Sequence, residues 1–198
     1  MNKKNTKDRK IGTALAAGII AAVVVLVIII GIIGVYNSLN RLNVDVDSAW
    51  SKVEVSYQRR ADLIPNLIET VKGAKNFEQG TLIKITEARS AWTNAKTSEE
   101  KVAAANGMES ALSRLMVVVE NYPDLKSNQN FLALQDELAN TENKISVERN
   151  RYNDAVTALN KKLVTFPTNM IAGMFNIGKR SFFQSSEGAE NAPAVSFE

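Results

Sequence analysis

The chain has 198 residues, of which 45% are apolar and 23% charged, a balance typical of a folded protein. It contains no cysteine and no histidine, which excludes disulfides, thiolate chemistry and the commonest side-chain base and metal ligand. The net charge is +3, and residues 1–10 alone contribute five basic side chains and one aspartate, or +4. The remainder sums to −1, so it gives no sign of a nucleic-acid surface.

A basic leader, residues 1–10, precedes an uncharged apolar run at residues 11–35. A helix of this length measures roughly 37 Å, enough to cross a hydrocarbon core of about 30 Å. A cleaved signal peptide would have an apolar region of only about 7–15 residues, and a buried soluble helix would be interrupted by polar residues. The sequence therefore predicts a single-pass transmembrane helix that contacts the lipid bilayer through residues 11–35.

The flanking charges also predict an orientation in the cell membrane. The basic leader is expected to stay in the cytoplasm under the positive-inside rule. Residues 36–50, after the apolar run, hold only Arg41 against Asp45 and Asp47. We therefore expect the large domain on the non-cytoplasmic side.

Apolar residues recur at spacings of three and four in four stretches, residues 39–71, 82–92, 102–119 and 131–163. Thr97 and Glu100 form the pattern of a capping box before the third stretch, and Pro123 marks a turn before the fourth. Each stripe must be buried, and the short connections favour antiparallel neighbours with shallow, coiled-coil-like crossing angles. The predicted fold is all-α, an N-terminal transmembrane helix followed by an elongated, up-and-down four-helix bundle over residues 36–166.

Positions seven residues apart lie on nearly the same face of a helix. Charged residues occupy several such positions in these stripes, where an apolar residue is expected. Opposite charges facing one another would neutralise the cost of burial. The alternative, a carboxylate metal site, is disfavoured because ferritin-like sites use histidine and because three arginines would repel a cation. We therefore expect an interior ion network with no metal or other cofactor. It comprises Arg60, Glu78, Arg89, Glu109, Glu142 and Arg149.

Pro65 lies inside the first helical stretch. Proline has no N–H to donate to the carbonyl of residue 61, so we expect a kink near residues 60–62. Arg59, Arg60 or Asn66 would satisfy the carbonyl groups that the kink frees. A kink stabilised by the inward ion network is the favoured interpretation, and a binding site at the kink is the alternative.

The C-terminal segment, residues 167–184, is apolar and basic, and it follows a helix that should return toward the membrane. It is expected to fold back over the end of the bundle, with contact to the lipid interface as the alternative. The remaining residues, 185–198, are small and polar and are expected to be disordered.

Several long motifs resemble the LemA family of bacterial membrane-anchored proteins. They include "RRADLIPNL" at residues 59–67, "YPDLKSNQNFLALQDELANTENKI" at 122–145 and "FPTNMIAGMF" at 166–175. The resemblance covers about residues 36–184 and implies an N-terminal anchor and a four-helix bundle, with no established catalytic activity. Where the family often has Tyr-x-x-His-Glu, this chain has "AKNFE" at residues 74–78. Some family members have the bundle in the cytoplasm, so the resemblance implies that side as the alternative orientation.

The sequence contains no glycine-rich phosphate loop, nucleophile elbow or metal-ligand spacing, so we expect a non-catalytic protein. The favoured function is a membrane-anchored scaffold or interaction module with an unknown protein partner. The alternative is a membrane-associated sensor that binds a small molecule or peptide near the Pro65 kink. The candidate interaction surface comprises Arg59, Asp62, Asn66, Tyr122, Asp124 and Asn128.

Overall fold

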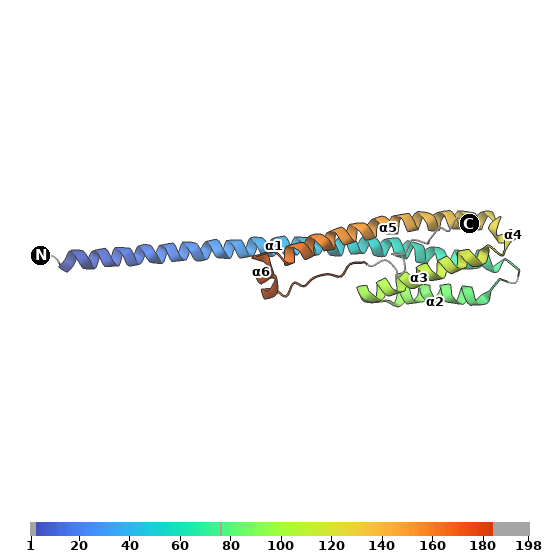
Figure 1. Ribbon diagram of the computed structural model, residues 1–198, viewed down its shortest axis with the longest axis horizontal. Coiled ribbons are helices and arrows are strands. Elements are labelled where there is room, and N and C mark those ends of the chain that lie inside the picture. The colour runs from blue at the N-terminus through green and yellow to red at the C-terminus, as the bar shows by residue number, and fades with distance from the viewer. Residues whose placement is uncertain (1–2, 76, 184–198) are drawn as a thin grey trace, which may run out of the picture. The chain divides into compact units, whose positions relative to one another are not determined.

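The computed structural model describes residues 3–75 and 77–183, and these residues form helices without a strand. The all-α class is therefore confirmed, as is a long apolar helix at the N-terminus (Figure 1). The helices are α1 (Lys3–Lys72), α2 (Gln79–Asn94), α3 (Ser98–Val119), α4 (Pro123–Lys126), α5 (Gln129–Leu163) and α6 (Thr168–Met174).

The chain divides into two compact units. It passes between them within α1, within α5 and in the non-helical segment after α6. The first unit comprises Met1–Val46 and Val156–Arg180. The second unit comprises Asp47–Ala155 and Ser181–Glu198. Helices α1 and α5 each contribute to both units, so each unit is described by itself below.

Within the first unit, the apolar part of α1 exposes its side chains. Ile19 is 64% exposed and Val24 is 52% exposed, and their apolar neighbours are similar. The helical stretch Gly18–Lys72 is long and apolar enough to cross a membrane. Helix α3 also passes this test, but a third of its apolar window is buried and it packs against α2, as expected for a core helix. The exposed part of α1 is compatible with association with a membrane.

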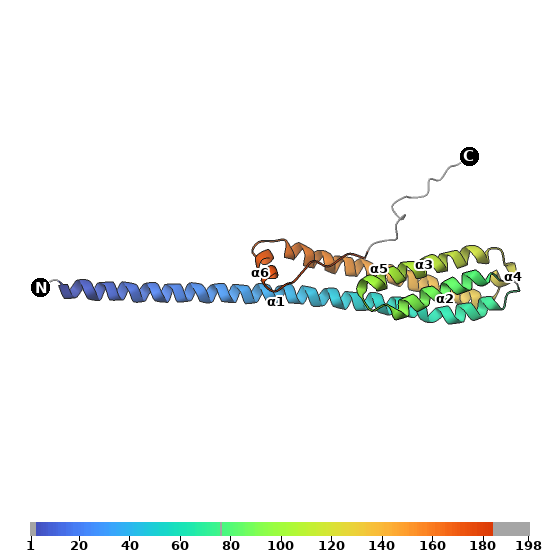
Figure 2. The same ribbon diagram turned by 90° about the horizontal axis from the view of Figure 1, so that it is seen from below.

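In the second unit, four helical segments lie side by side, from α1, α2, α3 and α5 (Figure 2). Their apolar stripes face inward because residues three and four apart share one face of a helix. The fully buried side chains include Val53, Ile64, Trp92, Leu115 and Ile145. Each of the four segments thus contributes to one core.

Side-chain caps fix two of the helix starts in the second unit. The Thr97 hydroxyl accepts from the Glu100 amide (3.1 Å), and Glu100 accepts from the Thr97 amide (3.2 Å), which confirms the predicted capping box. The Asn128 side chain accepts from the amides of Asn130 (2.9 Å) and Phe131 (3.2 Å) at the start of α5. These bonds satisfy amides that have no partner within their own helix.

Pro65 does not interrupt α1, which is helical on both sides of it. The carbonyl of Ala61 lacks its usual helical donor, and it accepts a hydrogen bond from Nε of Arg89 on α2 (3.0 Å). The expectation that Arg59, Arg60 or Asn66 would be the donor to this carbonyl is wrong. Arg59 and Arg60 instead pair with acidic residues of α5, which leaves the neighbouring helix to supply the donor.

The C-terminal segment of the first unit folds back along α1 and α5. The rings of Phe175 and Tyr36 have centroids 4.6 Å apart. Further along, the Arg180 guanidinium donates to Oδ1 of Asn43 (3.0 Å), and the Asn160 side chain exchanges two hydrogen bonds with the Arg180 backbone (2.9 and 3.0 Å). The expectation that the segment covers the end of the bundle stays a prediction. The tail expected to be disordered, residues 185–198, lies outside the described residues.

The Arg89 bond generates a double-mutant prediction. Arg89→Met should lower the free energy of unfolding by about 1–3 kcal/mol because the Ala61 carbonyl loses its donor. In a Pro65→Ala background the restored amide can donate to Ala61, so the same substitution should cost clearly less. Chemical denaturation of the four chains measures this coupling. Equal costs of Arg89→Met in both backgrounds would contradict the assignment.

Candidate functional site: a buried charge cluster

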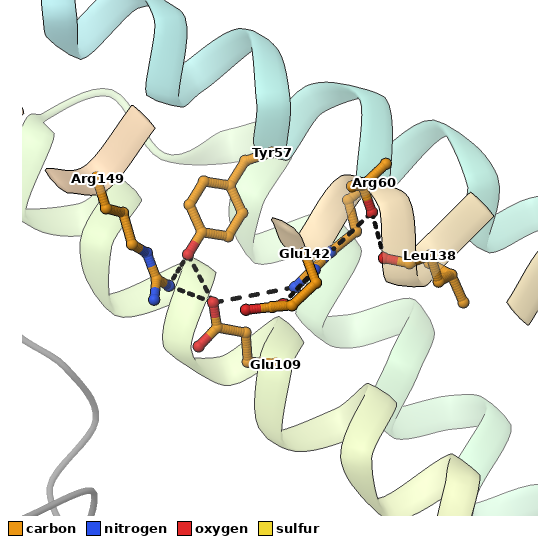
Figure 3. Close-up of polar contacts among 7 residues, drawn as sticks. Tyr57, Arg60, Glu109, Leu138, Glu142 and Arg149 are labelled. Atoms are coloured by element: carbon orange, nitrogen blue, oxygen red, sulfur yellow. Dashed lines mark hydrogen bonds and ion pairs between the residues drawn. The ribbon is translucent and has the colours of Figure 1, made fainter. Parts of the chain in front are cut away.

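Charged and polar side chains from three helices of the second unit meet between those helices (Figure 3). Arg60 is buried and Glu109 and Arg149 are mostly buried, whereas the Glu142 side chain is 51% exposed. Tyr57 and Arg60 are three residues apart on α1, so they share a face of that helix. Glu109 approaches from α3. Three residues of α5 complete the group. The charge cluster comprises Tyr57, Arg60, Glu109, Thr141, Glu142 and Arg149.

Arg60 is the most deeply buried charge of the cluster, with 3% of the residue exposed. Its guanidinium pairs with the Glu142 carboxylate and lies 3.9 Å from Oε1 of Glu109. Its Nε donates to the Thr141 hydroxyl (3.4 Å), which itself donates to the carbonyl of Leu138 (2.8 Å). The pairing therefore links α1 to both α3 and α5.

Glu109 accepts hydrogen bonds from two further residues of the cluster, Tyr57 and Arg149. The Tyr57 hydroxyl donates to Oε1 of Glu109 (2.7 Å), and Nη2 of Arg149 contacts both of these oxygens. Burial, together with the nearby Glu142 carboxylate, raises the pKa of Glu109 to about 7, although Arg60 acts to lower it. Burial also lowers the pKa of Arg149 to about 10. Desolvation thus acts against the charged form of both groups.

Of the six residues expected in the ion network, the structure brings four together, Arg60, Glu109, Glu142 and Arg149. It does not bring Glu78 or Arg89 to them. Glu78 immediately precedes the first residue of α2. The seven-residue spacing of helical positions therefore does not apply to it. Glu78 is exposed, and its Oε1 lies 3.9 Å from Arg114. Arg89 instead donates a hydrogen bond to the Ala61 carbonyl.

The sequence pattern missed three polar groups of this core. Tyr57 fits the apolar spacing of the first helical stretch, and that spacing gives no sign that its hydroxyl donates to Glu109. Thr141 and Glu148 are buried, one residue before the predicted Glu142 and Arg149. Thr141 lies four residues before the buried Ile145 and Glu148 three residues after it, so helical spacing from Ile145 predicts that both face inward. Glu148 accepts from Arg151 (2.8 Å) through Oε1, and its buried Oε2 has no hydrogen-bond partner within residues 3–75 and 77–183.

The residues proposed as an interaction surface have mixed environments. Arg59, Asp62, Asn66 and Asp124 are exposed, and Arg59 forms an ion pair with Glu137 of α5. Two others have structural roles. The Tyr122 ring packs on Phe77 with centroids 4.9 Å apart, and Asn128 caps α5.

A groove of about 350 Å³ opens beside the cluster, between α3 and α5. Its polar wall includes Arg60, Glu109 and Glu142, and its apolar wall includes Leu112 and Leu138. In the part of the chain that the structure describes, no three acidic side chains gather in a way that could hold a metal ion. Two arginines pair with two glutamates from other helices here, an arrangement suited to holding helices together.

The raised pKa of Glu109 generates a pH prediction. An ordinary glutamate has a pKa near 4.3, so between about pH 4.5 and 7 the folded chain binds more protons at this site than the unfolded chain. The free energy of unfolding should therefore fall as the pH rises through this window. Glu109→Gln removes the titration, so its unfolding free energy should fall less over the same range in denaturant titrations. Parallel curves for the two chains would contradict the burial of this carboxyl.

Comparison with known proteins gives a consistent relationship. The LemA family matches residues 49–197, three quarters of the chain. A protein named Protein LemA from Metamycoplasma hominis is 31% identical over 76% of this chain and 69% of its own length. Two proteins of Paramagnetospirillum magneticum, Magnetosome protein MamQ 1 and MamQ 2, are 22% identical over 90% of this chain and 75% of theirs. The resemblance seen in the motifs is confirmed, and the chain belongs to the LemA family.

Proposed function

We propose that this chain is a membrane-anchored, non-catalytic interaction module whose second unit presents helical faces to a protein partner. The exposure of the apolar part of α1 carries the proposal. Side chains such as Ile19, Val24 and Ile30 are more than half exposed along a helix long enough to span a bilayer. So large an apolar surface is favourable in lipid and costly in water. Family membership and the magnetosome-protein relatives support membrane association.

The charge cluster supports a structural rather than a catalytic role. Its carboxylates accept from arginines and a tyrosine of the same chain, so they have the partners that a substrate would otherwise supply. A general base needs a free lone pair directed at a substrate proton. The buried charges instead link α1, α3 and α5, so that the exposed helical faces are held rigidly for a partner.

We also propose on which side of the membrane the second unit lies and which of its surfaces binds the partner. The basic leader is retained in the cytoplasm and the second unit lies on the non-cytoplasmic side. Exposed polar residues near Pro65 and near the start of α5 offer contacts to the partner. They are Arg59, Asp62, Asn66, Asp124 and Ser127.

A second candidate function is a sensor of a small molecule or peptide. It is favoured by a groove whose lining includes Ile68, three residues after Pro65. The groove has a volume of about 700 Å³, within the range of about 300–1,000 Å³ that ligand pockets occupy. Apolar side chains of Ile68, Phe77 and Leu82 line it, with Lys72 and Glu87 also in the lining. This combination suits an amphipathic ligand.

The proposal is tested with a single cysteine, since the native chain has none. Ser127→Cys is treated in intact cells with a membrane-impermeant maleimide that carries a photo-crosslinker. We expect labelling without lysis, followed by capture of one protein in stoichiometric amount, identified by mass spectrometry. Ser51→Cys, on an exposed position of α1, is the matched control and should be labelled without capturing that protein.

Two results would overturn the proposal. Labelling of Ser127→Cys only after lysis would move the second unit to the cytoplasm. A small molecule that purifies with the full chain in equimolar amount, together with no captured protein, would favour the sensor.

A further inference from the structure

Phe183 occupies an aromatic slot in the second unit. The residue is 5% exposed although it follows a non-helical segment. Its ring is stacked on Tyr57, with centroids 6.1 Å apart, and lies 6.2 Å from the Trp50 ring. The guanidinium of Arg149 lies 4.4 Å from the centroid of the same ring, a cation–π distance. The Phe183 slot is defined as Trp50, Tyr57, Arg149, Tyr152 and Asn153.

The slot also binds the backbone of the segment. The Phe183 amide donates to Oδ1 of Asn153 (2.8 Å), and Nδ2 of Asn153 donates to the Phe183 carbonyl (3.1 Å). The Tyr152 hydroxyl donates to the carbonyl of Ser181 (3.0 Å). An asparagine side chain that donates and accepts at one residue recognises extended backbone whatever its sequence.

The two neighbouring phenylalanines show how selective the slot is. Phe182 is 49% exposed, whereas Phe183 is buried between the rings and the guanidinium. The slot therefore accepts one aromatic side chain, together with backbone hydrogen bonds that any extended peptide can make. Aromatic anchors that enter a pocket dominate many protein interfaces.

We propose that the Phe183 slot is a recognition site for an extended segment of a protein partner that brings an aromatic side chain, and that the chain's own segment fills it when the partner is absent. The inference rests on the proposed function, since it names where and how a partner of the module binds. The chain's own occupant indicates the chemistry of the partner segment, because the slot binds one aromatic ring and backbone groups that are not used in a helix. The segment is not part of a helix, so it can leave without unwinding one.

Arg149 couples this slot to the charge cluster. The same guanidinium that covers the Phe183 ring pairs with Glu109 and contacts the Tyr57 hydroxyl. The Tyr57 side chain likewise stacks on Phe183 and donates to Glu109. The slot is thus built on the rigid, charge-linked core, which lowers the ordering cost of binding a peptide.

The test uses the full chain in nanodiscs of zwitterionic lipid and a fluorescein-labelled peptide, GKRSFFQ, that copies residues 178–184. Phe183→Ala empties the slot, so this chain should bind the peptide at least tenfold more tightly than the native chain in fluorescence anisotropy. Adding Asn153→Ala should weaken that binding about tenfold because two hydrogen bonds are lost. Empty nanodiscs give the signal from lipid alone.

Phe182→Ala is the matched control, because it removes the exposed neighbour and leaves the slot filled, and it should bind the peptide as weakly as the native chain. A peptide with alanine in place of its second phenylalanine should not bind the Phe183→Ala chain. If Phe183→Ala unfolds, as circular dichroism would show, Phe183→Leu replaces it with the same expected order of affinities.

Equal affinity of the native and Phe183→Ala chains, or equal affinity for the two peptides, would overturn the inference. A protein captured through Ser127→Cys together with either of these results would leave the interaction module standing and reject only the slot. Failure of capture with specific peptide binding would reject the proposed surface instead.

Discussion

The burial of the Arg60 charge is the constraint on which the second unit depends. A guanidinium that is removed from water must be paired and hydrogen-bonded, or folding loses several kcal/mol. Glu109 and Glu142 come from different helices, so satisfying Arg60 fixes the positions of α3 and α5 against α1. An apolar core alone would tolerate more sliding of helix against helix, because hydrophobic contact has no direction.

Two other arginines of the second unit also bind groups from other elements, one a backbone carbonyl and the other the C-terminal segment. Arg89 supplies the hydrogen bond that Pro65 removes from α1. Arg149 pairs with Glu109 and covers the ring of Phe183. Each of these charges places a second element. A core held in this way supports the proposal that the second unit presents rigid surfaces to a partner.

Hydrophobic spacing predicted the all-α class and the long apolar helix because these follow from short-range periodicity. The same spacing indicated Arg60, Glu109, Glu142 and Arg149 as inward charges, and the structure brings these four together. It failed for Glu78, where the helix had not yet begun, and for Arg89, whose partner is a carbonyl group. Backbone carbonyls carry no sequence signal, and the docking of Phe183 depends on how a non-helical segment folds back, which periodicity does not describe.

The central claim is tested most directly by comparing two adjacent arginines on α1. Arg60 is 3% exposed, whereas Arg59 lies at the surface and pairs with Glu137. Denaturant titration of the full chain should show that Arg60→Met lowers the free energy of unfolding by about 2–3 kcal/mol, since its carboxylate partners are left without their buried cation. Arg59→Met should lower it by about 1 kcal/mol or less, as is usual for an exposed ion pair. Equal costs for the two substitutions would contradict the account.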